Sequence, residues 1–232
     1  EQELVNTTEG EGWCVSALAG SSLDEDVAAV FGFNKRQRAI IDTLELKAST
    51  VGEVQAVART VPSLLAGYVE IPTEPDPSIL IAAIGKSGLR AKARTGGITA
   101  DAFPASATLG RFIHKCVAAK VPLKLTAGLH HPLRATYRLT YEPDSPTGMM
   151  YGFLNIFIAT AIAQNGGSVD DIVAALEELS PSAFHLNDSE ISWRAHRIDI
   201  AGIMSLRSEL AVSFGSCSFT EPIEDLKTLN FL

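Results

Sequence analysis

Ionisable side chains recur on one face of four short segments in which polar and apolar residues alternate. These segments cover residues 43–48, 67–72, 89–94 and 122–127. Residues two apart share a face of an extended strand, so the charged residues of each segment point the same way. The set comprises two acids and four bases: Glu45, Lys47, Glu70, Lys92, Arg94 and Lys124. Because unpaired buried charge is costly, the pattern predicts a pocket with a positive excess, suited to a carboxylate or phosphate. A structural ion-pair network and a solvated face of edge strands are the alternatives.

Lys124 is the main catalytic candidate. Like charge from Lys92 and Arg94, together with burial, is expected to lower its amine pKa. A neutral amine can act as a base or form a Schiff base with a carbonyl carbon. Glu45 or Glu70 would then be the acid–base partner. A simple anion anchor for Lys124 and a counter-ion role for either glutamate are the alternatives.

Two turns of small residues follow the last two charged segments, at residues 95–97 and 126–128. Backbone N–H groups at Gly96 and Gly97, with the Thr126 hydroxyl, could bind an anion. A tight strand-to-helix turn also favours the Gly-Gly pair. His130 and His131 follow in the next loop, and adjacent side chains of an extended chain point apart. One of them could be a general acid or metal ligand and the other structural, or both could bond to the backbone.

Metal and cofactor sites are not expected. Glu45 and Glu70 with one histidine could hold a metal ion, but the neighbouring lysines argue against it. The cysteines at 14, 116 and 217 are far apart and form no zinc pattern. No histidine is near Cys217 in the sequence, so we expect it to be buried and inert rather than nucleophilic.

The elements that position these residues alternate between strand and helix patterns. Strand patterns occupy 13–19, 184–193 and the four charged segments; helical patterns occupy 24–30, 51–61, 77–86, 106–120, 149–164, 169–179 and 200–213. Charged strands recur at steps of about 22 to 32 residues, which predicts βαβ units and a parallel sheet. Central strands of an open doubly wound sheet are continuously apolar, whereas these alternate. We therefore predict a single α/β domain over residues 1–232, a (β/α)8 TIM-type barrel. Only six strand patterns are found, so either two strands have patterns too weak to recognise or, as we expect, N-terminal strands are missing.

Composition excludes several classes of protein. The formal net charge of −8, without a basic run, argues against nucleic-acid binding. The longest apolar stretch, residues 149–163, is too short for a membrane span of ~20 residues, and the polar N-terminus contains no signal peptide. Three widely spaced cysteines fit a reducing compartment. We expect a cytoplasmic protein with no membrane or nucleic-acid partner, and homo-oligomers are possible.

Three motifs resemble those of a family of uncharacterised bacterial proteins of about 300 residues. They are KARTGG at 92–97, KLTAGLHHP at 124–132 and FGSCSFTEP at 214–222. The resemblance covers nearly the whole chain and implies two further N-terminal strands, but it implies no activity. Residues 124–128 are also similar to the Schiff-base strand end of class I aldolases of the deoxyribose-phosphate type. Their Gly-Gly phosphate turn likewise follows a lysine-bearing strand, as Gly96-Gly97 does, although the order of the two strands is reversed here.

These observations predict an enzyme of lyase or isomerase type that acts on a small anionic carbonyl or sugar-phosphate substrate at the C-terminal mouth of the barrel. Lys124, Glu45, Glu70 and His130 are the catalytic candidates. Residues expected to bind the anion are Lys47, Lys92, Arg94, Gly96, Gly97, Thr126 and His131. The alternative is a non-catalytic protein that binds a small anionic metabolite or acts in an assembly.

Overall fold

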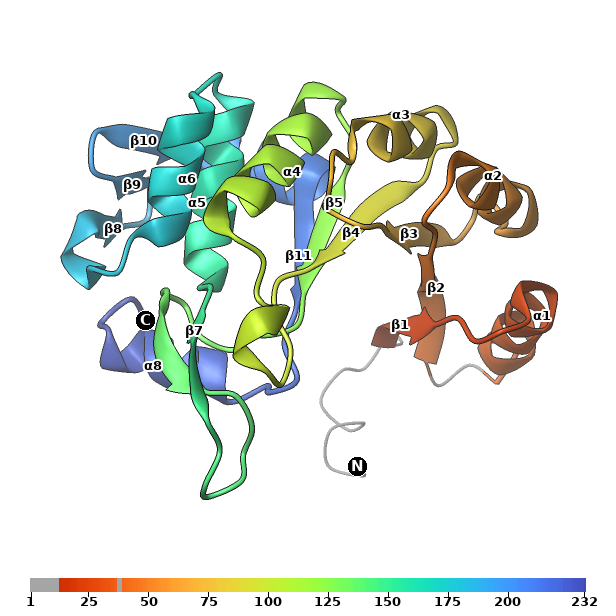
Figure 1. Cartoon of the computed structure of the whole chain (residues 1–232), viewed down its shortest axis with the longest axis horizontal. Coiled ribbons are helices and arrows are strands. Elements are labelled where there is room, and N and C mark those ends of the chain that lie inside the picture. Colours follow the sequence, from red (N-terminus) through yellow and green to blue (C-terminus); the bar gives the residue numbers. More distant parts are fainter. Residues whose placement is uncertain (1–12, 37–38) are drawn as a thin grey trace.

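A six-stranded parallel sheet forms the centre of the molecule in the computed structural model, which describes residues 13–36 and 39–232 (Figure 1). Its strands follow the order β1-β2-β3-β4-β5-β11. They are β1 (Trp13–Leu18), β2 (Ala39–Lys47), β3 (Ala66–Glu70), β4 (Arg90–Arg94), β5 (Leu123–Thr126) and β11 (Ala211–Gly215). The first five strands are spatial neighbours in sequence order, as consecutive βαβ crossovers require.

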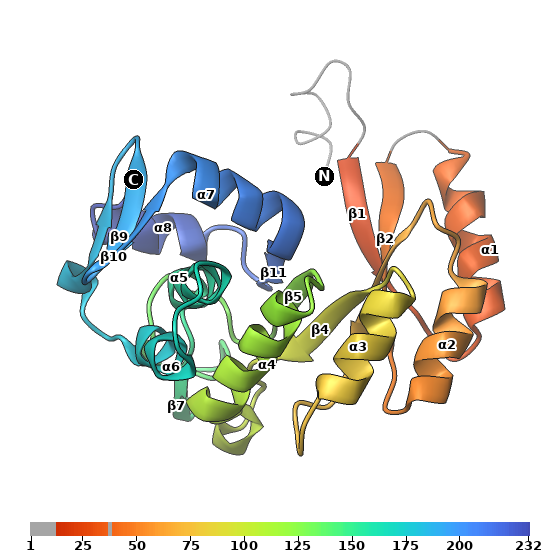
Figure 2. The ribbon, with the colours of Figure 1, turned by 90° about the horizontal axis from the view of Figure 1, so that it is seen from above.

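Helices connect these strands along one face of the sheet. They are α1 (Leu23–Asn34), α2 (Val51–Thr60), α3 (Ser78–Lys86) and α4 (Ser106–Ala118). Figure 2 shows the sheet curling, with these four helices on its outer, convex side. A capping box begins α2, because the Thr50 hydroxyl accepts from the Glu53 N–H and the Glu53 carboxylate accepts from the Thr50 N–H.

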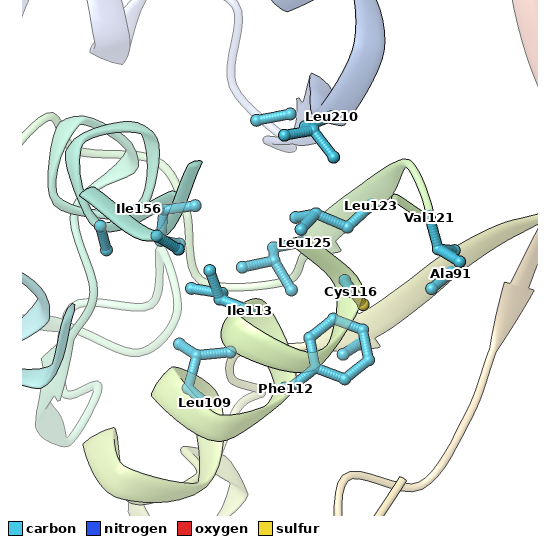
Figure 3. Packing of buried hydrophobic residues seen from close by; sticks show 14 of the residues in the cluster. Ala91, Leu109, Phe112, Ile113, Cys116, Val121, Leu123, Leu125, Ile156 and Leu210 are labelled. Atoms are coloured by element: carbon cyan, nitrogen blue, oxygen red, sulfur yellow. The ribbon is translucent and has the colours of Figure 1, made fainter. Parts of the chain in front are cut away.

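The hydrophobic core fills the space between the convex face and the helices. Phe112 and Cys116 of α4 lie against Ala91 of β4, and Ile113 lies near Leu125 of β5 (Figure 3). All five side chains are 1% exposed or less. The alternate residues of the same strands, including the charged ones, therefore point to the concave face.

The segment between β5 and β11 adds further layers. It contains the hairpin of β6 (Ala135–Arg138) and β7 (Thr147–Met150), then α5 (Phe153–Gln164) and α6 (Val169–Glu177). A separate antiparallel sheet follows, with β8 (Phe184–Leu186), β9 (Glu190–Trp193) and β10 (His196–Asp199) in the order β10-β9-β8. Next come α7 (Ile200–Ser205) and a π-helical turn η4 (Leu206–Leu210), and α8 (Glu221–Thr228) follows β11. Short 3-10 turns lie at η2 (Ala100–Ala102) and η3 (Pro181–Ala183).

The predicted (β/α)8 TIM-type barrel with missing N-terminal strands is wrong. Over residues 13–36 and 39–232, β1 pairs in this sheet only with β2, and β11 only with β5, so the sheet has two open edges. The alternating strand pattern misled the prediction. The concave face of an open, curled sheet can carry polar residues just as the inner face of a barrel does.

Two assignments near the C-terminus need correction. Residues 184–193 contain strands, as predicted, but these strands, β8 and β9, belong to the separate sheet; the helix predicted over 200–213 ends before β11. The sequence of β11, AVSFG, is too short for its periodicity to distinguish a strand from a continuing helix. The open side of the main sheet therefore lies between β1 and β11.

Helix α5, predicted over 149–164, begins at Phe153 because Met149 and Met150 belong to β7. Nine of its twelve residues are buried. In the part of the chain that the structure describes, no helix is both long and apolar enough to cross a membrane.

Candidate functional site

A cavity of about 480 Å³ lies on the concave face at the C-terminal ends of the strands. Strands β2, β4 and β5 contribute Glu45, Lys92, Arg94, Lys124 and Thr126 to its wall. The remaining lining comes from neighbouring strands and loops: Leu18, Gly97, Ile98, Ala127, Gly128, His130, Leu139, Met150, Gly215, Ser216 and Cys217. In an open parallel sheet this end of the strands is where ligands bind.

Four charged side chains, each 12% exposed or less, form one network beside this cavity. The Lys92 ammonium lies 2.8 Å from Glu45 Oε2 and 2.9 Å from Glu70 Oε2. Lys124 Nζ donates to Glu45 Oε1 at 2.6 Å, and the Ser16 hydroxyl donates to the same oxygen at 2.7 Å. Strand register explains the convergence, because Lys92 is paired with Glu70 on one side and with Lys124 on the other.

The contacts within the network hold Glu45 and Lys92 in their charged forms. Burial alone raises the pKa of Glu45, but hydrogen bonds from Lys124, Lys92 and Ser16 together outweigh it and lower that pKa to about 2. Burial lowers the pKa of Lys92, and the contacts with Glu45 and Glu70 more than offset this and raise it. Lys92 is therefore a fixed cation, held between two carboxylates.

The predicted positive excess is not buried. Two buried cations, Lys92 and Lys124, face the carboxylates of Glu45 and Glu70. The Lys47 side chain is 80% exposed and lies 3.9 Å from Glu70. Lys47 lines a neighbouring cavity with Glu45 and Lys92, so it lies at the edge of the site.

Arg94 and Thr126 occupy the mouth of the cavity. Arg94 is exposed, and within the described ranges its side chain makes no ion pair. The Thr126 Oγ1 atom is buried and has no hydrogen-bond partner among the described residues. A buried hydroxyl without a partner costs free energy, so Thr126 would gain stability from a polar ligand.

The two turns of small residues lie side by side. The Thr95 hydroxyl donates to the Ala127 carbonyl at 2.6 Å and so joins them. Gly97 lines the cavity, whereas a Cβ on Gly96 would overlap the Phe103 ring. Close packing against Phe103 is therefore a sufficient reason for glycine at position 96.

The two adjacent histidines have different environments. His130 lines the cavity, and its Nδ1 is 3.3 Å from the Ser216 hydroxyl. His131 Nδ1 lies 2.6 Å from an Asp225 carboxylate oxygen, and its ring stacks on Tyr137. Among residues 13–36 and 39–232, no group of three or more histidines, cysteines or acids is arranged to hold a metal ion.

Sequence reasoning missed several residues of the site. Ser16 shares the concave face, but the segment 13–19 is otherwise apolar and so gives no reason to include Ser16 in the site. Tyr68 is 2% exposed beneath the network, with Lys124 Nζ 5.6 Å from its ring centre. Cys217 is exposed beside His130, so the prediction that it is buried is wrong. Cys217 and His130 are 87 positions apart, so the sequence gives no signal for this contact.

Comparisons with family models, curated proteins and solved structures find no significant match to this chain. The resemblances to a bacterial family and to aldolases therefore stay predictions. The comparisons likewise give no support for lyase, isomerase or anion-binding activity. The site has to be interpreted from its own chemistry.

Proposed function

We propose that the protein is an enzyme that acts on a small carbonyl compound carrying an anionic group, bound in the concave-face cavity. The main support is that one cavity is lined by Lys124, Arg94 and Thr126, and that the buried Thr126 hydroxyl has no hydrogen-bond partner in the described part of the chain. Its volume of about 480 Å³ is in the range of small-molecule sites.

The distribution of charge assigns different tasks to the cations. Lys92 is held between Glu45 and Glu70 and would act as a structural cation. Arg94 is exposed at the mouth, where a planar guanidinium can bind a carboxylate or phosphate through two parallel hydrogen bonds. The anionic group would therefore lie at Arg94, with the carbonyl carbon towards Lys124.

Lys124 would be the nucleophile. After the ammonium has passed one proton to a base, the amine would attack the carbonyl carbon, form a C–N bond and release the carbonyl oxygen as water, giving a Schiff base. Glu45 is a weak base because its pKa is about 2. His130 lines the same cavity, and burial lowers its pKa, so its neutral imidazole can take the proton from Lys124.

Borohydride trapping tests this chemistry. A panel of small aldehydes and keto acids with a phosphate or carboxylate group is incubated with the protein and reduced. Because hydride converts the Schiff base to a stable amine, we expect at least one compound to leave its mass on the peptide containing Lys124. Lys124→Arg retains the positive charge beside Glu45 and should abolish the adduct, whereas Lys47→Arg should retain it. Labelling confined to exposed lysines would refute the Schiff-base role.

A non-catalytic binding protein is the second candidate. It is favoured by the pairing of all four buried charges, which gives the network a sufficient structural role without catalysis. Such a protein would bind anions in the same cavity but show no trapping at Lys124.

Anion binding itself is tested by thermal unfolding. We expect phosphate to raise the melting temperature more than chloride does at matched ionic strength, because binding to the native state stabilises it by mass action. At about 100 times Kd the gain in unfolding free energy is about 2.7 kcal/mol. Arg94→Ala should remove most of this gain and leave the fold intact, while Arg59→Ala on α2 should not change it. Equal stabilisation by phosphate and chloride would rule out the anion site.

A further inference from the structure

A thiol, an imidazole and a phenol meet where β11 ends. Cys217 Sγ lies 3.4 Å from Nδ1 and 3.6 Å from Nε2 of His130. The Tyr141 hydroxyl lies 3.6 Å from the same sulfur and donates to the Glu221 carboxylate at 2.9 Å. These four side chains, here called the thiol cluster, come from two distant parts of the chain, residues 130–141 and 217–221.

The thiol cluster lies between two cavities. Cys217 and His130 line the cavity that contains Lys124, and they also line a neighbouring cavity of about 490 Å³. Tyr141 and Glu221 line the second cavity only. A small molecule in either cavity can therefore reach the sulfur, which is exposed.

His130 is in the protonation state that can accept the thiol proton. Burial, together with the nearby His131, lowers the pKa of His130 despite the opposing charge of Glu221. The imidazole is therefore neutral near pH 7 and able to accept a proton. Cys217, partial burial and Glu221 raise the pKa of Tyr141, so the phenol keeps its proton.

We propose that Cys217 is a nucleophile with His130 as its general base, and that this pair adds to the carbonyl carbon of a small aldehyde. The Cys217 S–H bond breaks and its proton passes to His130 while the S–C bond forms. The imidazolium then returns that proton to the former carbonyl oxygen. The product is a hemithioacetal, and no oxidant, reductant or leaving group is needed. The class of ligand rests on the proposed function, whereas the reactivity of the thiol is independent of Lys124.

Alkylation with iodoacetamide at pH 7 measures the nucleophile directly. Rates are followed for each cysteine by peptide mass spectrometry. Because an adjacent base supplies thiolate, we expect Cys217 to react at least about tenfold faster than the thiol of N-acetylcysteine in the same buffer, while buried Cys116 stays unmodified. His130→Gln should reduce the Cys217 rate to about that of N-acetylcysteine. The matched variant His185→Gln, at an exposed position of β8, should leave the Cys217 rate within about twofold.

Glyoxylate, an aldehyde that carries a carboxylate, then serves as the probe of the ligand class. It should slow alkylation of Cys217 in the wild type and equally in Lys124→Arg, which separates the thiol site from the Schiff-base site. Equal alkylation of Cys217 and N-acetylcysteine, or an unchanged Cys217 rate in His130→Gln, would overturn the nucleophile and its base. Fast alkylation without protection by glyoxylate would overturn the aldehyde as ligand. The absence of borohydride trapping would affect only the role of Lys124.

Discussion

Replacing Glu45 with glutamine will lower the free energy of unfolding by about 3 to 5 kcal/mol at pH 7, as expected when a buried ion pair loses one partner. Glu45 is 9% exposed and accepts from Lys92, Lys124 and Ser16. An amide would remove the negative charge that Lys92 and Lys124 share and place an N–H group against an ammonium. Urea unfolding of both proteins, compared at a common m-value, measures the loss.

Glu190→Gln is the matched control, because Glu190 pairs with Arg197 at 2.6 Å on the surface. The loss of unfolding free energy in Glu190→Gln should stay below about 1 kcal/mol.

The pH dependence of stability gives a second check on Glu45. Its folded pKa of about 2 is below the ordinary value of 4.5, so its stabilisation is complete above pH 4.5 and is lost as the pH falls towards 2. The gap between wild type and Glu45→Gln should therefore narrow over that interval. A constant gap from pH 7 to pH 2 would contradict the assignment.

Replacing Asn155 with leucine will destabilise the protein by about 3 kcal/mol, because three backbone groups lose a partner in the interior. Asn155 is 0% exposed. Its amide donates to the carbonyls of Ala175 and Glu178, and its oxygen accepts from the Arg134 N–H. These bonds join α5 and the end of α6 to the loop after His131.

Thr160→Val is the control for Asn155, since Thr160 is equally buried on the same helix. The Thr160 hydroxyl donates only to the Ile156 carbonyl, which also accepts a bond within the helix. We expect a cost below about 1 kcal/mol. Thermal unfolding followed by circular dichroism compares the two variants. Similar costs for both would show that the backbone bonds of Asn155 contribute little.

Local patterns were sufficient to locate most of the parallel sheet. The strand pattern at 43–48 ends within one residue of β2, and the pattern at 89–94 ends with β4. The same alternation correctly placed Glu45, Lys92 and Lys124 on one face of the sheet. Their strands lie close together because consecutive strands of a βαβ series are also neighbours in space.

Features that depend on distant pairing could not be obtained in this way. Closure of a sheet depends on whether its two edge strands meet, and no local pattern of β1 or β11 reports this. The contact between His130 and Cys217 requires β11 to pair with β5, which is also a long-range event. The prediction of a buried surplus of positive charge was wrong because the position of Lys47 in its strand indicates only which face of the sheet it lies on. It does not indicate that the long side chain extends into solvent.

The long sequence separation between β5 and its partner β11 affects how the cavity forms during folding. Strands β1 to β5 join through crossovers of local span, whereas β5 ends at Thr126 and its partner β11 begins only at Ala211. Closing this longest loop of the sheet carries its largest entropic cost, and such non-local contacts slow folding. The wall of the cavity that contains Glu45, Lys92 and Lys124 therefore forms through strand pairings between segments close together in the sequence. The wall that contains Ser216 and Cys217 depends on the pairing with the highest contact order in the sheet.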